Sequence, residues 1–143
     1  MHWDRATFSL DPDVEHDVEV ARRYDVPVLI TASDPCERRR LAQHIHDHSG
    51  RTGTFVTLRS VNDWEINPSQ LRHATVFIDD VGTLDQREQG ALMHLLEHRA
   101  AVGATSCRII AASDGRLYPS MIRGDFRADL YYWLAIIHIV IPD

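Results

Sequence analysis

The chain has 143 residues, enough for one domain with its own hydrophobic core. Its net charge of −6 argues against a free-standing nucleic-acid-binding protein, although a local basic patch remains open. No apolar run approaches membrane-spanning length and the first residues are polar, so we expect neither a membrane segment nor a signal peptide. The two cysteines, Cys36 and Cys107, are too few and too far apart to suggest a disulfide framework, which favours a reducing cytoplasm.

Strand-like and helix-like segments alternate along the chain after a short lead-in at residues 1–10. A helix is expected to start at Asp11-Pro12-Asp13, where proline and acidic residues suit a first turn, and to end near Tyr24. Further helices are expected at residues 35–48, 85–99 and 126–134, with a short one within 59–72. Strands are expected at residues 26–31, 54–58, 75–78, 107–112 and 136–141, and a loop at 113–124.

This alternation predicts a single α/β domain over residues 1–143, with a five-stranded, mostly parallel sheet and helices on both faces. Ligands of such folds bind at the carboxyl ends of the strands. That edge is expected to collect residues 32–38, Asp79, Asp80, Ser113 and Asp114.

The turn Ala32-Ser33-Asp34-Pro35-Cys36-Glu37-Arg38 follows the first strand, where the amides of a helix N-terminus can bind phosphate. A phosphate-binding loop needs glycines and a lysine, and this turn has neither. Asp34 is suited to cap the helix, Pro35 to occupy its first position and Glu37 to complete a capping box. A self-capped turn without a ligand therefore competes with a divergent phosphate site.

Asp79 and Asp80 follow the third strand and allow two interpretations, a Mg²⁺ site or a simple acidic pair at a strand end. A receiver-like phosphoacceptor is a further hypothesis, but paired acids after the first strand and a suitable late lysine are both missing. The chain has no lysine at all, which excludes any mechanism that needs a catalytic lysine.

Histidines and a cysteine allow weaker hypotheses. The pairs His44/His48 and His94/His98 have a spacing that can bind zinc, although the sequence places no third ligand. Cys36 lies at a helix start beside three arginines, a setting that favours a reactive thiol, but the sequence positions no base for a nucleophile role.

Four segments resemble one family in one order. They are Val28-Leu29-Ile30-Thr31 with Ile45-His46, Phe77-Ile78-Asp79-Asp80-Val81-Gly82, Arg108-Ile109-Ile110-Ala111-Ala112-Ser113-Asp114 and Phe126-Arg127-Ala128-Asp129-Leu130-Tyr131-Tyr132. Together they resemble the AAA+ core of bacterial sigma-54-dependent transcription activators, over residues 26–142. The resemblance implies a P-loop NTPase fold, ATP and Mg²⁺ as cofactors, and association with other AAA+ subunits.

The phosphate-binding part departs from the family pattern. The glycines of the Walker A loop correspond to Ala32, Pro35 and Glu37, and its lysine corresponds to Arg38, with Arg39 following. Arg and Lys are not interchangeable in a tight phosphate site. The remaining residues that the resemblance assigns to nucleotide binding are Ser33, Asp34, Cys36 and, at the sensor position, Asp114.

The catalytic part also departs. The Walker B pair corresponds to Asp79, which implies a Mg²⁺ ligand, and to Asp80, one methylene shorter than the glutamate that polarises water. Arg127 matches the first of two arginines that act across a subunit interface, and Trp133 stands at the second. We expect no counterpart of the sigma-54-contacting loop between Leu58 and Ala74, and neither a helical lid nor a DNA-binding helix-turn-helix.

The leading hypothesis is a divergent AAA+ core in bacterial transcriptional regulation or signalling, acting in the cytoplasm as a protein-interaction module with impaired or absent ATP hydrolysis. The alternative is a nucleotide-binding ATPase that uses Arg38, Asp79 and Asp80 with Mg²⁺. A third hypothesis is a protein that caps rings of a full-length activator through Arg127. The expected partners are other AAA+ subunits, a regulatory protein or further copies of this chain, without direct nucleic-acid or membrane contact.

Overall fold

The computed structural model describes residues 12–58, 72–102 and 107–142. The expected lead-in, the short helix within 59–72 and the shortened segment between Leu58 and Ala74 fall almost entirely outside the described residues. Within them the helices are α1 (Pro12–Arg23), α2 (Pro35–Asp47), α3 (Gln86–Val102), α4 (Leu117–Arg123) and α5 (Ala128–Leu134), with a 3₁₀ turn η3 (Val81–Thr83). The strands are β1 (Val28–Thr31), β2 (Phe55–Leu58), β3 (Thr75–Ile78), β4 (Arg108–Ser113) and β5 (Ile137–Val140).

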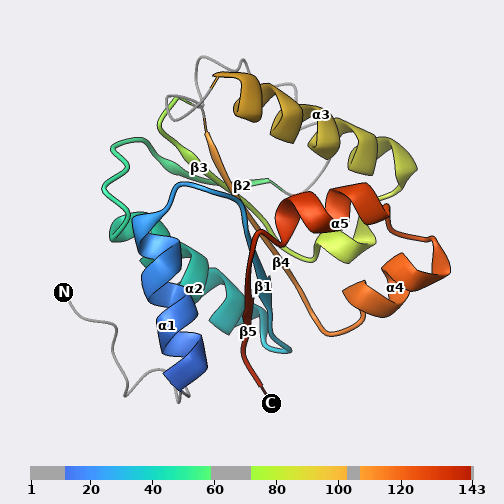
Figure 1. Ribbon diagram of the computed structural model, residues 1–143, viewed down its shortest axis with the longest axis horizontal. Helices are drawn as coiled ribbons and strands as arrows, with labels where there is room; N and C mark the ends of the chain where they lie inside the picture. The colour runs from blue at the N-terminus through green and yellow to red at the C-terminus, as the bar shows by residue number, and fades with distance from the viewer. Residues whose placement is uncertain (1–11, 59–71, 103–106, 143) are drawn as a thin grey trace.

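The five strands form one sheet in the order β2-β3-β4-β1-β5, and each neighbouring pair is parallel. Helices α1 and α2 lie on one face and α3, α4 and α5 on the other (Figure 1). This confirms the expected α/β fold with a parallel sheet covered on both sides. No helix in the described ranges has the length and apolar character to cross a membrane.

Alternate residues of the central strands pack into two separate hydrophobic cores, one on each face of the sheet. Ile109 and Ala111 of β4 pack on the α3 and α5 side, whereas Ile110 and Ala112 pack on the α1 and α2 side. Because successive side chains of a strand point to opposite faces, a strand buried on both faces is apolar throughout. This is why β1, β3 and β4 read as continuous apolar runs.

The prediction of a loop at residues 113–124 is wrong for its second half, because α4 forms there, at Leu117–Arg123. Pro119 is the third residue of α4, a position whose backbone amide has no partner inside a helix, so proline is tolerated. Gly124 ends the helix with φ 87°, a conformation that suits glycine.

Candidate functional site

The residues expected at the carboxyl edge of the sheet do meet there. The turn after β1 contacts the end of β4, because the amide of Ala32 donates to the carbonyl of Ser113 at 3.0 Å. Asp79 and Asp80 follow β3, the strand next to β4, and Asp114 follows β4 itself.

The turn before α2 is capped by its own carboxylate. The Cys36 amide donates to Asp34 Oδ1 at 2.9 Å, and Pro35 occupies the first helical position. In a capping box the side chain of Asp34 would accept from the amide of Glu37. Here it accepts from the amide of Cys36 instead. The side chains of Ser33, Asp34 and Cys36 are exposed, and Ala32 is buried behind them. The carboxylate of Asp34 thus takes an amide that an anion at this helix start would use.

Arg38 is buried under this turn and is bonded to the protein itself. Its Nε donates to Asp79 Oδ1 at 2.8 Å and its Nη1 donates to the Ala32 carbonyl at 2.8 Å. The side chain is 6% exposed, whereas that of Asp79 is 29% exposed. The residues at the lysine and Mg²⁺-ligand positions of the family pattern therefore pair with each other.

Asp80 adopts a left-handed conformation with φ 52° and ψ 48°. Its amide donates to Asp79 Oδ1 at 2.8 Å, and its carbonyl accepts from the hydroxyl of Thr83 at 2.8 Å. This bend starts η3, which the sequence pattern did not predict. It leaves Asp80 exposed while Asp79 points back toward Arg38.

Asp114 is held by an arginine that the sequence analysis did not single out. Arg116 donates to Asp114 Oδ2 from Nε at 2.9 Å and from Nη2 at 2.6 Å, and its amide donates to Oδ1 at 2.9 Å. These hydrogen bonds hold the pKa of Asp114 below its ordinary value. The signal for this pair was its spacing of two residues directly after an apolar strand.

Two hollows open at this edge. One of about 390 Å³ is lined in part by Pro35, Cys36, Arg39, Asp79 and Asp80, together with Thr83, which the sequence analysis missed. The other, of about 240 Å³, lies between Asp80, Asp114 and Arg116. Within the described part of the chain, no three His, Cys, Asp or Glu side chains are grouped to hold a metal ion.

Arg127 lies outside both hollows, at the start of α5. Its guanidinium donates to both carboxylate oxygens of Asp129, from Nε at 3.0 Å and from Nη2 at 2.7 Å. Its amide donates to Gln89, a buried side chain of α3 that the sequence analysis also missed. Trp133, which stands at the position of the second arginine, is partly buried against the α3-side core.

The histidine pairs and Cys36 differ in their surroundings. His44 and His48 have ring centroids 4.3 Å apart, and burial together with the nearby His48 and Arg22 lowers the pKa of His44 to about 4. His94 and His98 are exposed on α3. Cys36 is an exposed free cysteine that lines the larger hollow.

This arrangement does not fit a Mg²⁺-bound nucleotide. The cation that would meet the phosphates donates to Ala32 and Asp79, and the carboxylate that would hold Mg²⁺ accepts from Arg38. The carboxylates of Asp34 and Glu37 add negative charge at the helix start, where an anion would lie.

Comparison with known proteins identifies the family. The family model described as the Sigma-54 interaction domain matches residues 69–140. The transcriptional regulatory protein GlrR of Escherichia coli is 26% identical over 98% of this chain and 39% of its own length. The nitrogen fixation protein AnfA of Azotobacter vinelandii is 37% identical over 48% of this chain and 14% of its own length. This chain thus spans well under half the length of these relatives.

Solved structures show the same fold. NtrX from Brucella abortus in complex with ATP has a TM-score of 0.75 and 19% identity, over 91% of this chain and 36% of NtrX. The P-loop NTPase domain of an E. coli sigma-54 activator has a TM-score of 0.65 and 18% identity, over 82% of this chain and 98% of that domain. The domain therefore has the P-loop NTPase fold of the AAA+ type, and the chain belongs to the sigma-54 interaction domain family of transcription regulators.

Proposed function

We propose that this domain acts in bacterial transcriptional regulation as a protein-interaction module of the sigma-54 activator type, in which ATP hydrolysis is impaired or absent. The observation that carries the proposal is the partly buried bond between Arg38 and Asp79. Breaking it to admit phosphate and Mg²⁺ would expose a buried guanidinium to a new partner and cost a charge-assisted hydrogen bond.

Two further contacts support the loss of hydrolysis. Asp114 keeps a carboxylate where the family pattern has a neutral sensor asparagine, and Arg116 stabilises its negative charge. Arg127, the counterpart of a residue acting across the subunit interface, is bonded to Asp129 of its own helix. Each contact satisfies within the chain a group that a hydrolytic site would need for nucleotide.

A nucleotide-binding ATPase is the alternative, and one geometric feature favours it. Asp79 and Asp80 border a hollow of about 390 Å³, and the structurally similar NtrX was solved with ATP. If Arg38 substitutes for lysine there, nucleotide binding depends on Mg²⁺ and is abolished in Arg38→Ala.

Phosphate release from ATP by the purified chain tests the proposed loss of hydrolysis. We expect the wild-type rate with Mg²⁺ to equal that of Asp80→Asn at every protein concentration, because the wild-type site does not assemble. Wild-type turnover above the Asp80→Asn background would reject the loss of hydrolysis and favour the alternative.

Capture of a full-length sigma-54 activator tests the interaction role separately. We expect the immobilised chain to retain activator subunits and Arg127→Ala to retain fewer, because Arg127 lies on the face used for subunit contact in the family pattern. Arg87→Gln, which removes an exposed charge from α3, is the matched control. Equal retention by all three proteins would contradict a role for the Arg127 face, and no retention by any would contradict the interaction with AAA+ subunits.

A further inference from the structure

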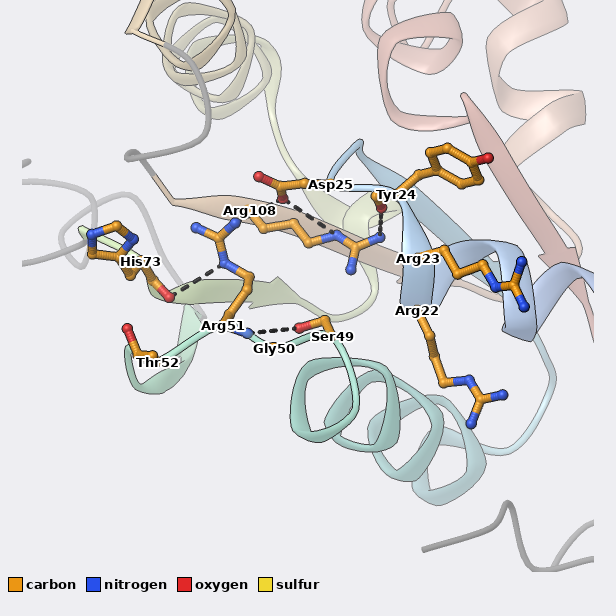
Figure 2. Close-up of a pocket in the computed structure, with 10 residues that line it drawn as sticks. All are labelled: Arg22, Arg23, Tyr24, Asp25, Ser49, Gly50, Arg51, Thr52, His73 and Arg108. Carbon is orange, nitrogen blue, oxygen red and sulfur yellow. Dashed lines mark hydrogen bonds and ion pairs between the residues drawn. The ribbon is translucent and has the colours of Figure 1, made fainter.

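A pocket of about 350 Å³ lies at the opposite, amino-terminal edge of the sheet (Figure 2). Its walls come from the end of α1 and the two residues that follow it, from the loop between α2 and β2, from His73 ahead of β3, and from the start of β4. Four of its ten lining residues are arginines, namely Arg22, Arg23, Arg51 and Arg108. One acidic residue, Asp25, lies among the ten. This excess of positive charge is local, since the whole chain carries a net charge of −6.

Arg108 is fixed in the wall of this pocket. The side chain is 1% exposed, and its Nη2 donates to the carbonyls of Ala21 at 2.7 Å and Tyr24 at 2.8 Å. Its Nε donates to the carbonyl of Val26 at 3.1 Å. Carbonyl oxygens accept these hydrogen bonds without cancelling the formal charge of the guanidinium, so the positive charge persists at the pocket wall.

Arg51 lines the same pocket from the loop after α2, while the Arg108 guanidinium extends toward Tyr24 (Figure 2). The Nη1 of Arg51 lies 2.7 Å from Asp25 Oδ1, and the same oxygen lies 4.0 Å from Arg108 Nε. The Nε of Arg51 donates to the carbonyl of His73 at 3.3 Å. Two guanidiniums from distant parts of the chain are thereby held in place before any ligand arrives, which lowers the entropic cost of binding.

Arg22 and Arg23 add two guanidiniums from the last turn of α1. Both form ion pairs with one carboxylate, Glu19, on the preceding turn of the same helix. The Arg23–Glu19 pair is exposed and the Arg22–Glu19 pair is partly exposed. Ion pairs near the surface contribute roughly 1 kcal/mol or less, so a more highly charged anion can displace Glu19. These two side chains are therefore available to a ligand without loss of the fold.

We infer that this pocket binds a small anion that carries more than one phosphate group. The planar fork of arginine matches phosphate oxygens in two parallel hydrogen bonds, and Arg22 and Arg23 on α1 supply such forks here. The buried guanidiniums of Arg51 and Arg108 donate to the protein and supply positive charge at the pocket wall. The volume of about 350 Å³ exceeds what a single phosphate would fill. The pocket lies at the other end of the strands from the carboxyl-edge hollows. Its ligand therefore binds independently of any nucleotide at the carboxyl edge.

Calorimetric titration of the full chain with sodium pyrophosphate, without divalent metal, tests this inference. We expect saturable binding that weakens with added salt, and a dissociation constant raised about tenfold in Arg22→Gln/Arg23→Gln because charge-assisted contacts are lost. The matched control is Arg40→Gln/Arg87→Gln, which removes the same net charge from exposed positions on α2 and α3. It is expected to keep the wild-type affinity.

Backbone amide spectra of the same samples locate the ligand. We expect pyrophosphate to shift the amide signals of Gly50, Arg51 and Arg108 and to leave those of Cys36 and Asp80 unchanged. No binding at millimolar pyrophosphate would overturn the inference. It would equally be overturned by unchanged affinity in Arg22→Gln/Arg23→Gln, by equal weakening in the control variant, or by shifts confined to the carboxyl edge.

Discussion

The guanidinium of Arg38 donates to Asp79 and to the Ala32 carbonyl, and so joins the turn after β1 to the end of β3. Sequence comparison alone marks Arg38 as a substitute for lysine and Asp79 as a Mg²⁺ ligand. The two roles cannot be filled together while the two side chains bond each other. At the scale of single residues, Arg38 and Asp79 therefore use their hydrogen-bonding groups on the protein itself.

Asp79→Asn tests how strongly this pair stabilises the fold. We expect it to lower the free energy of unfolding by about 2–4 kcal/mol, because the buried Arg38 charge loses its carboxylate. Urea denaturation measures the change. Asp80→Asn is the matched control, since Asp80 is exposed and asparagine tolerates the left-handed conformation there. Equal destabilisation by both variants would show that the Arg38 bond contributes nothing particular.

Three histidines predict the pH dependence of stability. Burial lowers the pKa of His44 to about 4 and also lowers the pKa of His46 and His138. Between the unfolded pKa of about 6.5 and the lower folded values, the unfolded chain binds more protons, so stability falls as pH falls. We expect the urea midpoint to be constant above about pH 7.5 and to drop between pH 6.5 and 4.

His44→Gln separates this effect from general acid denaturation. We expect the variant to lose less stability than the wild type between pH 6.5 and 4, because glutamine takes up no proton. His94→Gln, at an exposed position of α3, serves as the control and keeps the wild-type slope. A wild-type midpoint that rises on acidification would contradict the assignment.

Gly53 allows a close approach between the loop before β2 and the residues that lead into β3. A Cβ at Gly53 would collide with backbone atoms of His73 and Ala74, and the Gly53 amide donates to the His73 carbonyl at 3.0 Å. This contact also sets the wall of the arginine-lined pocket, which includes His73. At the scale of elements, the amino-terminal edge of the sheet depends on this glycine.

Gly53→Ala is expected to lower the free energy of unfolding by roughly 1–3 kcal/mol, because backbone atoms cannot yield as a flexible side chain can. Thermal or urea unfolding measures it. Gly115→Ala is the control, since a Cβ there meets nothing within 4 Å. It should stay within about 0.5 kcal/mol of the wild type or stabilise slightly. A larger loss for Gly115→Ala than for Gly53→Ala would contradict this account of the edge.

Hydrophobic periodicity predicted the elements well, because both faces of the sheet are covered and β1, β3 and β4 are apolar throughout. It missed α4, whose Pro119 and Gly124 are typical loop residues that here occupy the first turn and the end of a short helix. The sequence pattern placed the candidate residues at one edge of the sheet, but it did not predict which of them bond to each other. The bonds of Arg38 and of Arg116 depend on side-chain geometry that no spacing rule specifies.

The whole domain has the P-loop NTPase fold, a carboxyl edge that holds the Arg38–Asp79 and Arg116–Asp114 pairs, and an amino-terminal edge rich in arginine. The family membership accounts for the first feature. The paired charges at the carboxyl edge lead to the proposed loss of hydrolysis. The arginine-lined pocket leads to the proposed site for an anion with more than one phosphate group. In the proposed function, the domain retains the fold while Arg38 and Asp79 close its nucleotide site.

Calorimetric titration of the full chain with ATP and ADP, with and without Mg²⁺, tests that claim most directly. Any heat from the arginine-lined pocket is identified by repeating the titration in Arg22→Gln/Arg23→Gln, which leaves the carboxyl edge intact. We predict no Mg²⁺-dependent, saturable binding in that variant at millimolar nucleotide. Saturable binding at micromolar nucleotide that requires Mg²⁺ and is abolished in Arg38→Ala would contradict the account and establish a working nucleotide site.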